Sequence, residues 1–331
     1  MAFATYLRRT LLSIPVAALV VGCATTGGCP PEAEAPLVAE AVFEKDRDPR
    51  PEGLSDLTAI GGNRYLSVDD RGGMLHELEI ELGGSGAVRH CKAVRGVRLE
   101  GRTDLEGCAF DPLDGRVWVT DEHDTSIRQF DPATGEETAK VLVPEVFGRH
   151  AVRNRSFESI AITPDGLRMY VANEDTLACD GEGANRKSGG VVRIQEFART
   201  GKGAPWTAAR QFRYRTEKVG GGEFAGVAVS GVVALIAAED GSLLVLEREM
   251  SKKNPLFPSF RARLFEVRPD ADRSDELAKR VVWDRDTMFA NYEGACFGPR
   301  LKDGSRSIIL VSDGGGPAKE RVLVLALRPP R

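Results

Sequence analysis

The sequence predicts an all-β fold, a single β-propeller of five or six four-stranded blades whose ring is closed by an N-terminal strand. A unit of about fifty residues, built from two short apolar strands and a turn, recurs along the chain, and this length is typical of one propeller blade. The 36 glycines and 18 prolines, set against 7% aromatic residues, indicate many short elements joined by turns. A single β-sandwich is the main alternative, but it would not require the same acidic position in each unit.

The first element, residues 1–22, is predicted to be a lipoprotein signal peptide. Arg8 and Arg9 give it a positive start, and the apolar run at residues 11–21 is too short to span a bilayer. This run ends in Val-Val-Gly-Cys, which resembles a bacterial lipobox and implies cleavage before Cys23 and attachment of acyl chains, such as palmitate, to that residue. An ordinary signal peptide that contains a cysteine is the alternative.

Residues 23–36, rich in Ala, Gly, Pro and Glu, are predicted to form a flexible tether between lipidated Cys23 and a propeller domain at residues 37–331. We therefore expect the protein in the bacterial cell envelope, held to the membrane by a lipid anchor. Ala24 stands where an aspartate is usually linked to inner-membrane retention, which favours the periplasmic face of the outer membrane.

Each repeat unit has a leading acid, an apolar strand, a turn, a second apolar strand and closing acids. The leading acids of the three clearest units are Glu106, Glu158 and Glu293. Asp56 is the leading acid of a degenerate unit, and another degenerate unit has Ala234 at this position. The long stretch before Ala234 contains residues 223–229, which leave five and six blades both open.

Closure of the ring has a candidate at the N-terminus. The last unit has only residues 321–327 after its second strand, whereas residues 36–43 form an isolated strand-like run. We predict that this early strand completes the last blade, which would leave no open sheet edge.

The charge and the cysteine content of the sequence limit the kinds of partner that the protein can bind. The formal net charge of −4 and the absence of a basic run argue against nucleic acid, and we expect a monomer. Besides Cys23 there are five cysteines, an odd number, so at least one thiol stays unpaired or pairs between chains. Cys108 and Cys296 lie in apolar strands and are predicted to act as small buried hydrophobic residues.

Several motifs together carry a family resemblance. They are Gly53-Leu54-Ser55 with Val68-Asp69-Asp70-Arg71-Gly72, Asp104-Leu105-Glu106-Gly107 with Thr120-Asp121-Glu122, Asn154-Arg155-Ser156-Phe157-Glu158, Leu243-Leu244-Val245-Leu246-Glu247-Arg248, and Tyr292-Glu293-Gly294 with Leu310-Val311-Ser312-Asp313. Over residues 53–313 the chain resembles the bacterial phytase-like family, described as esterase-like activity of phytase. The resemblance implies an exported propeller related to calcium-dependent phytases, with a loosely defined hydrolase activity.

The acids of the repeat predict a site. Innermost strands line the centre of a propeller, and antiparallel pairing brings the end of the second strand back to the face where the first begins. Facing carboxylates are unfavourable unless cations or protons neutralise them, and hard oxygen donors suit Ca²⁺. The predicted metal ligands are Asp56, Glu106, Asp121, Glu122, Glu158, Glu174, Glu293 and Asp313. The alternative is structural: such acids can accept backbone hydrogen bonds or pair with Arg71, Arg155 and Arg248.

Three further side chains are candidates for binding and catalysis. Arg71 and Arg155 are predicted to hold an anionic substrate, although a salt bridge would explain either of them. His123 falls on the acidic face and is the candidate general acid or base, against the alternative of an exposed loop histidine. The sequence contains no G-x-S-x-G elbow, which argues against an α/β-hydrolase site.

The leading functional hypothesis is an envelope-anchored, metal-assisted phosphoester hydrolase that acts on an anionic small molecule or an envelope component. Ala234 interrupts the ring of acids, and lysine is nearly absent from the motif positions, which argues against a highly charged substrate such as phytate. The rival hypothesis is a noncatalytic binding or scaffold lipoprotein that uses the propeller face.

Overall fold

The computed structural model describes residues 35–44, 51–102, 104–220, 228–251, 259–270, 276–314 and 319–328. The chain divides into two units, Met1–Glu32 and Ala33–Arg331, and every described residue belongs to the second. The predicted signal peptide, the lipidation site Cys23 and most of the predicted tether lie outside the described residues. Within those residues, no helix combines the length and apolar character needed to cross a membrane.

Five antiparallel sheets of four strands each make up the described domain, and we call them blades 1 to 5 in chain order. Blade 1 contains β2 (Thr58–Gly61), β3 (Arg64–Val68), β4 (Met74–Leu82) and β5 (Val88–Arg98); blade 2 contains β6 (Leu105–Phe110), β7 (Val117–Asp121), β8 (Ser126–Phe130) and β9 (Glu137–Lys140). Blade 3 contains β10 (Phe157–Ile162), β11 (Arg168–Asn173), β12 (Val191–Ala198) and β13 (Thr207–Arg215); blade 4 contains β14 (Ala228–Ala237), β15 (Leu243–Ser251), β16 (Ser259–Val267) and β17 (Lys279–Met288). Blade 5 contains β18 (Asn291–Arg300), β19 (Arg306–Asp313), β20 (Arg321–Leu327) and, from the N-terminus, β1 (Leu37–Val42).

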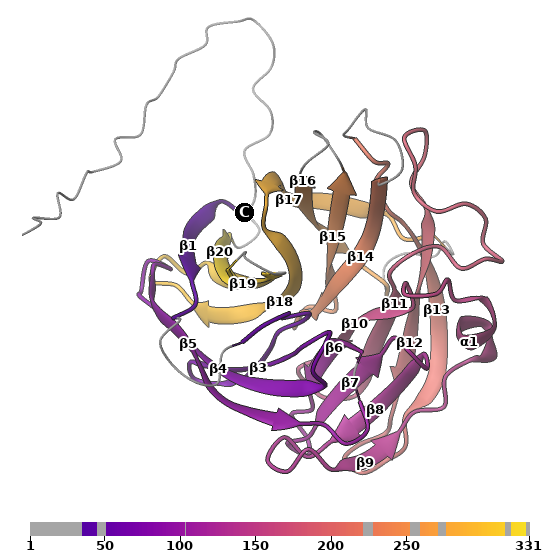
Figure 1. Ribbon diagram of the computed structural model, residues 1–331, viewed down its shortest axis with the longest axis horizontal. Coiled ribbons are helices and arrows are strands. Elements are labelled where there is room, and N and C mark those ends of the chain that lie inside the picture. Colours follow the sequence, from indigo (N-terminus) through magenta and orange to yellow (C-terminus); the bar gives the residue numbers. More distant parts are fainter. Residues whose placement is uncertain are drawn as a thin grey trace, which may run out of the picture. The chain divides into compact units, whose positions relative to one another are not determined.

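The blades follow one another around a ring (Figure 1). The first strands of successive blades, β2, β6, β10, β14 and β18, contact one another in that order, and β18 returns to β2. The propeller prediction is therefore confirmed, with five blades rather than six. Of the stretch that left a sixth blade open, residues 221–227 lie outside the described residues and β14 begins at Ala228.

The predicted closure of the ring is also confirmed. β1 pairs antiparallel with β20, with Ala39 opposite Val324 and Val42 opposite Arg321, and so forms the outermost strand of blade 5. Joining the two ends of the chain in one sheet leaves blade 5 complete.

Packing between blades explains the apolar strands. The second strand of a blade is buried almost throughout, as in β7 and β19, because neighbouring blades cover both faces of the sheet. Between blades 5 and 1, for example, Ile309 and Val324 belong to one buried cluster with Leu54 and Tyr65. Burial of each such aliphatic side chain contributes about 1.5–3 kcal/mol.

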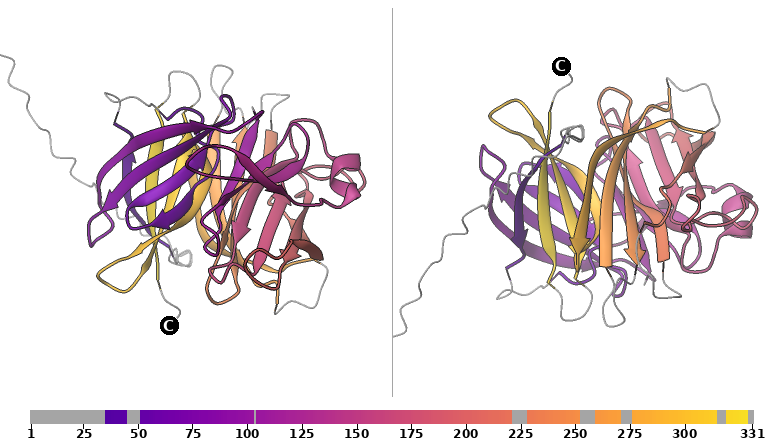
Figure 2. Two further views of the ribbon diagram at one scale, coloured as in Figure 1. Left: turned by 90° about the horizontal axis from the view of Figure 1, so that it is seen from below. Right: turned by 90° about the horizontal axis from the view of Figure 1, so that it is seen from above.

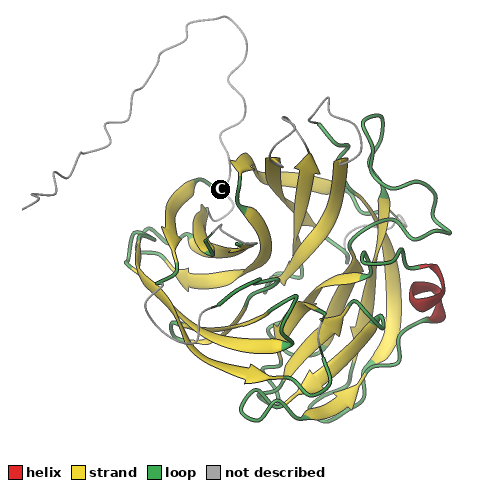
Figure 3. Cartoon of the chain, in the orientation of Figure 1, coloured by secondary structure: helices red, strands yellow, loops and turns green. Residues whose placement is uncertain are grey.

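Side views show the strands of each blade running between the two faces of the ring, so that strand ends gather on the faces (Figure 2). Helix α1 (Glu145–His150) lies at the periphery, outside the strands of blade 3 (Figure 3). The described cysteines are free thiols, and Cys108 and Cys296 are buried as predicted.

Candidate functional site

A β-bulge sits at the leading acid of three blades. In blade 3 the register shifts between Phe157 and Ser159, so that Glu158 has no partner opposite it on β11. Equivalent shifts fall at Glu106 in blade 2 and at Glu293 in blade 5. A bulge bends the strand and re-aims a side chain. The bulge therefore fixes the position of the leading acids.

Blade 4 has the same bulge without an acid. The shift lies between Val232 and Ala234, so Val233 holds the bulged position. The sequence repeat placed Ala234 there, one residue too far along, because blade 4 has no acid by which to align its unit with the others. The interruption of the acidic series at this blade is nevertheless real.

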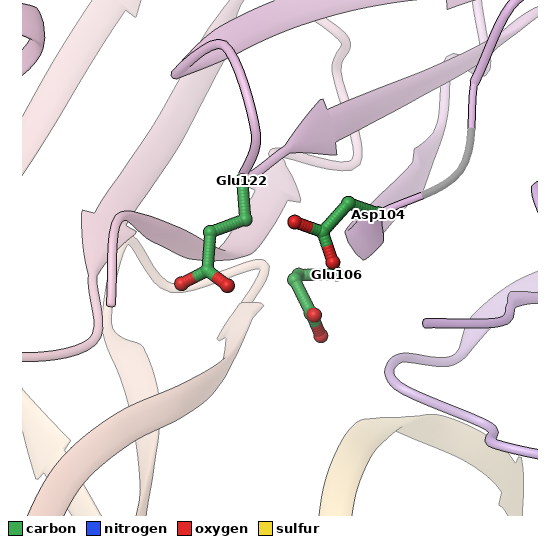
Figure 4. Close-up of side chains that lie close together, drawn as sticks. All are labelled: Asp104, Glu106 and Glu122. Atoms are coloured by element: carbon green, nitrogen blue, oxygen red, sulfur yellow. The ribbon is translucent and has the colours of Figure 1, made fainter. Parts of the chain in front are cut away.

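Two groups of carboxylates meet where β6 and β10 begin and where β7 and β11 end. Asp104, Glu106 and Glu122 offer oxygen atoms that all lie within 4.8 Å of one another; we call them the first cluster (Figure 4). Glu122, Glu158 and Glu174 satisfy the same limit and form the second cluster. The two clusters share Glu122. We call these acids, together with Glu293, the acidic centre.

Two acids of the centre are buried without a partner. Glu106 is 8% exposed and Glu158 is 7% exposed, and neither carboxylate has a hydrogen-bond or ion-pair partner among the described residues. Burial raises the pKa of Glu106 well above its usual range, and neighbouring carboxylates, Glu293 and Glu122 foremost, raise it further. Burial and then Glu106 raise the pKa of Glu158 in the same direction. Buried charges of this kind are normally paired or bound to a metal.

Glu122, which both clusters share, has a hydrogen-bond partner. Its Oε1 accepts a hydrogen bond from the backbone N–H of Ser156 at 2.8 Å. Burial nevertheless raises its pKa to about 7, with Glu174 and Asp104 adding to the effect against the hydrogen bond from Ser156. Burial and the neighbouring Asp121 also raise the pKa of Asp104. Negative charge on the acidic centre therefore has a free-energy cost that a bound cation would offset.

Arg248 contacts two acids of this centre directly. Arg248 of β15 donates from Nη2 to Oε1 of Glu174 at 2.6 Å, and its Nη1 lies 3.5 Å from Oε1 of Glu293. Burial opposes its charge, yet the surrounding carboxylates, Glu174 first, raise its pKa above the usual range. The Nε of Arg248 is buried and has no partner among the described residues. Sequence reasoning considered Arg248 only as a salt-bridge partner.

Asp56, one of the predicted metal ligands, lies in neither cluster. It is buried, and its two oxygens accept backbone hydrogen bonds from Leu57 at 2.7 Å and from Cys108 of blade 2 at 2.9 Å. The neighbouring blade 5 packs so closely that a Cβ at Gly294 would lie 2.5 Å from the backbone of Asp56. These contacts give Asp56 a role in joining blades.

We predict that Asp56→Ala lowers the free energy of unfolding by about 1–3 kcal/mol, because it leaves the buried backbone N–H groups of Leu57 and Cys108 without an acceptor. Calcium affinity should not change. Urea unfolding and calcium titration of the same variant measure the two quantities. A loss of calcium binding with unchanged stability would restore Asp56 to the list of ligands.

The remaining predicted ligands have other contacts. Asp121 lies 3.2 Å from Nη1 of Arg102 and accepts the backbone N–H of His123. Glu293 accepts a hydrogen bond from Nδ2 of Asn291 and has a pKa raised to about 7 by burial, against the opposing effect of Arg248. Asp313 lies 3.7 Å from Nη2 of Arg71. Each lies beside the clusters rather than within one.

The proposed anion-binding and catalytic residues lie at the rim. Arg71 is 64% exposed at its side chain and contacts Asp70 and Asp313. Arg155 donates to Asp175 at 2.8 Å and lowers the pKa of Glu122. His123 is exposed, and its charge lowers the pKa of Asp104. Both arginines are therefore already paired with carboxylates.

Sequence reasoning missed Asp104 as a ligand. It stands two residues before Glu106, inside a motif that the sequence already singled out. Residues two apart on an extended chain point to the same side, and this signal could have found it.

Five four-stranded blades surround a centre where Glu106 and Glu158 have no bonded partner in the described part of the chain, which defines a β-propeller with a candidate cation site. The chain belongs to the phytase-like family: the model of this family, described as esterase-like activity of phytase, matches residues 49–314. No curated protein matches the sequence.

Solved structures share only a distant likeness. The luciferin-regenerating enzyme is 10% identical, with 86% of this chain and 95% of that chain covered and a TM-score of 0.43. For streptogramin B lyase the identity is 11%, the coverage 86% and 97%, and the TM-score 0.38. For the hydrazine synthase of Kuenenia stuttgartiensis the identity is 14% and the TM-score 0.37, and the match covers 82% of this chain but only 59% of that chain. At these TM-scores the likenesses carry no argument about function.

Proposed function

We propose that the acidic centre binds a divalent hard cation, Ca²⁺, and that the protein is a metal-assisted hydrolase of phosphoesters or related esters. One observation carries the proposal: Glu106 and Glu158 are buried without partners among the described residues, beside further carboxylates. A fold keeps such groups only where something else neutralises them or where function requires them.

The donor set fits calcium. The first cluster offers only carboxylate oxygens, from a strand and from the residues beside two strand ends, which is the hard and loosely arranged type of donor that Ca²⁺ prefers. Asp104, Glu106 and Glu122 would hold the ion. When bound, a hard cation supplies Lewis-acid stabilisation for the charge that develops on a phosphoryl oxygen.

The residues of the rim supply the other roles in this proposal. His123 follows Glu122 and is exposed, so that its imidazole can exchange protons with substrate or solvent. Arg155 and Arg71 would each contact an anionic group with the guanidinium while staying paired with Asp175 and Asp70. The substrate class is an anionic small molecule or an envelope component.

The proposal includes the cellular setting expected from the sequence. A lipid anchor at Cys23 would hold a monomeric propeller at the periplasmic face of the outer membrane, and residues 23–36 would give it reach. Membership of the phytase-like family supports the hydrolase part of the proposal.

One observation favours the rival, a noncatalytic binding or scaffold protein. Arg71, Arg155 and Arg248 each pair with a carboxylate, which is the arrangement expected if the acids and arginines stabilise loops. The rival predicts no calcium binding and no turnover.

Calorimetric titration of the chelator-treated full chain with calcium tests the proposal. We expect binding at micromolar concentrations and a loss of affinity of at least about tenfold in Glu106→Gln, because the cation loses one charged ligand. Glu145→Gln is the matched control, since Glu145 lies on α1 with its side chain 82% exposed. Phosphomonoester, phosphodiester and carboxylester substrates then test turnover. If no heat is measured at millimolar calcium, the metal proposal is wrong and the noncatalytic binding or scaffold protein is favoured.

A further inference from the structure

The two clusters of the acidic centre differ in one respect. In the first cluster, among the described residues, Glu106 has no hydrogen-bond or ion-pair partner and Asp104 forms no ion pair with an arginine. In the second cluster, Oε1 of Glu174 already accepts a hydrogen bond from Arg248 at 2.6 Å. Across the described part of the chain, one cluster thus presents three carboxylates without a bonded basic partner, whereas the other includes a carboxylate that is already half neutralised.

The backbone fixes this pairing. Gly231 lies opposite Arg248 in the register of β14 and β15. A Cβ at Gly231 would lie 2.7 Å from Cγ of Glu174 and 2.9 Å from its carbonyl oxygen, and that oxygen accepts the N–H of Val232 at 3.2 Å. Glu174 is therefore held against blade 4, at the point where Arg248 projects from the neighbouring strand.

The charge of Arg248 acts across the whole centre. Its guanidinium is stabilised by Glu174, Glu293, Glu158 and Glu106, in that order of strength. A divalent cation in the second cluster would have to share Glu174 with this guanidinium and would be repelled by it at short range. The first cluster meets less repulsion, because Arg248 forms its direct contacts with Glu174 and Glu293 and interacts least with Glu106 among the four acids.

We propose that Arg248 is the built-in cation of the second cluster: the protein binds one divalent ion, at Asp104, Glu106 and Glu122, and removal of Arg248 opens a second ion site at Glu122, Glu158 and Glu174. This inference rests on the proposed function. It assigns to Arg248 control over the number of cations. Glu158, which is 7% exposed, would bind an ion only when Arg248 is removed.

The number of bound ions tests the inference directly. Calorimetry and metal analysis after equilibrium dialysis, both with calcium and the full chain, should give one ion for the wild type and two for Arg248→Gln. Arg248→Lys keeps the positive charge and should keep one ion. In Arg248→Gln/Glu174→Gln the second cluster loses a charged ligand, and the count should return to one.

The outcomes separate this inference from the proposed function. A wild type that binds one ion together with an Arg248→Gln variant that also binds one ion would overturn the inference and leave the proposed calcium site standing. Two ions in the wild type would overturn it as well, and this measurement does not depend on the folding of any variant. A wild type that binds no calcium would overturn the proposed function and, with it, the inference.

Discussion

Arg248→Gln is expected to lower the free energy of unfolding of the metal-free protein by about 3–5 kcal/mol near pH 8, since it leaves buried carboxylates without their cation. The guanidinium is 13% exposed and contacts Glu174 and Glu293, which are themselves 6% and 13% exposed at their side chains. Solvent cannot replace it at this depth. The loss should therefore exceed that of any exposed ion pair in the described part of the molecule.

The effect of this substitution should depend on pH. Near pH 5 Glu293 takes up a proton, because its pKa is already about 7 with the arginine present, and Glu106 and Glu158, whose pKa values burial raises well above the usual range, do the same. The acidic centre then carries less negative charge, and loss of the cation costs less. Saturating calcium should also recover part of the lost stability near pH 8, if a second ion enters where Arg248 was.

Arg71→Gln is the matched control, because Arg71 pairs with carboxylates of the same face but is 64% exposed. Its removal should cost less than about 1 kcal/mol. Urea unfolding of both chelated variants at the two pH values gives the comparison. Equal losses for Arg248→Gln and Arg71→Gln would show that burial does not set the strength of the Arg248 contacts, and the buried guanidinium would then be no stronger a partner than an exposed one.

The fold could be predicted from the sequence because its signals are local and repeated. A turn, an apolar strand and a leading acid recur at blade length, and the strand that closes the ring could be identified because blade 5 lacked one. The choice between five and six blades could not be made, since the interval before Val233 is longer than the others and length alone does not distinguish a long loop from a blade.

The candidate site was predicted only in outline. The sequence placed Glu106, Glu122, Glu158 and Glu174 on one face, and the two clusters contain all four. It could not choose between Asp121 and Glu122, because Asp121 ends β7 and Glu122 follows it, and the repeat does not show at which residue the strand ends. It also offered no reason to separate Asp56, whose oxygens bind backbone N–H groups of two blades.

The centre that gives the protein its candidate function also lowers its stability. Acids whose pKa values lie above those of the unfolded chain favour the folded state only while they are protonated. The unfolded chain releases these protons at lower pH than the folded one. Stability is therefore fully present below the ordinary pKa of glutamate and is lost as the pH rises through the higher pKa of the folded state.

Glu122→Gln is accordingly expected to stabilise the metal-free protein near pH 8 by up to about 3 kcal/mol, from a pKa raised from 4.5 to about 7. The glutamine Oε1 can keep the hydrogen bond from the N–H of Ser156, so only the buried charge is removed. Near pH 4 the two proteins should be equally stable. With saturating calcium the order should reverse near pH 8, because the wild type gains the binding free energy and the variant has lost the ligand that both clusters share.

Glu77→Gln provides the control of opposite sign. Burial raises the pKa of Glu77, but hydrogen bonds from Arg95 and Arg64 outweigh it and lower the pKa below its usual value, so this variant should lose stability near pH 8 and respond little to calcium. Thermal and urea unfolding of both variants and the wild type across the pH range, with chelator and with calcium, measure these effects. If Glu122→Gln is destabilised near pH 8 in chelator, as Glu77→Gln should be, then Glu122 is a structural carboxylate held by its backbone hydrogen bond. If Glu122→Gln is more stable than the wild type in chelator and less stable in calcium, then Glu122 is a metal ligand whose buried charge lowers the stability of the metal-free fold.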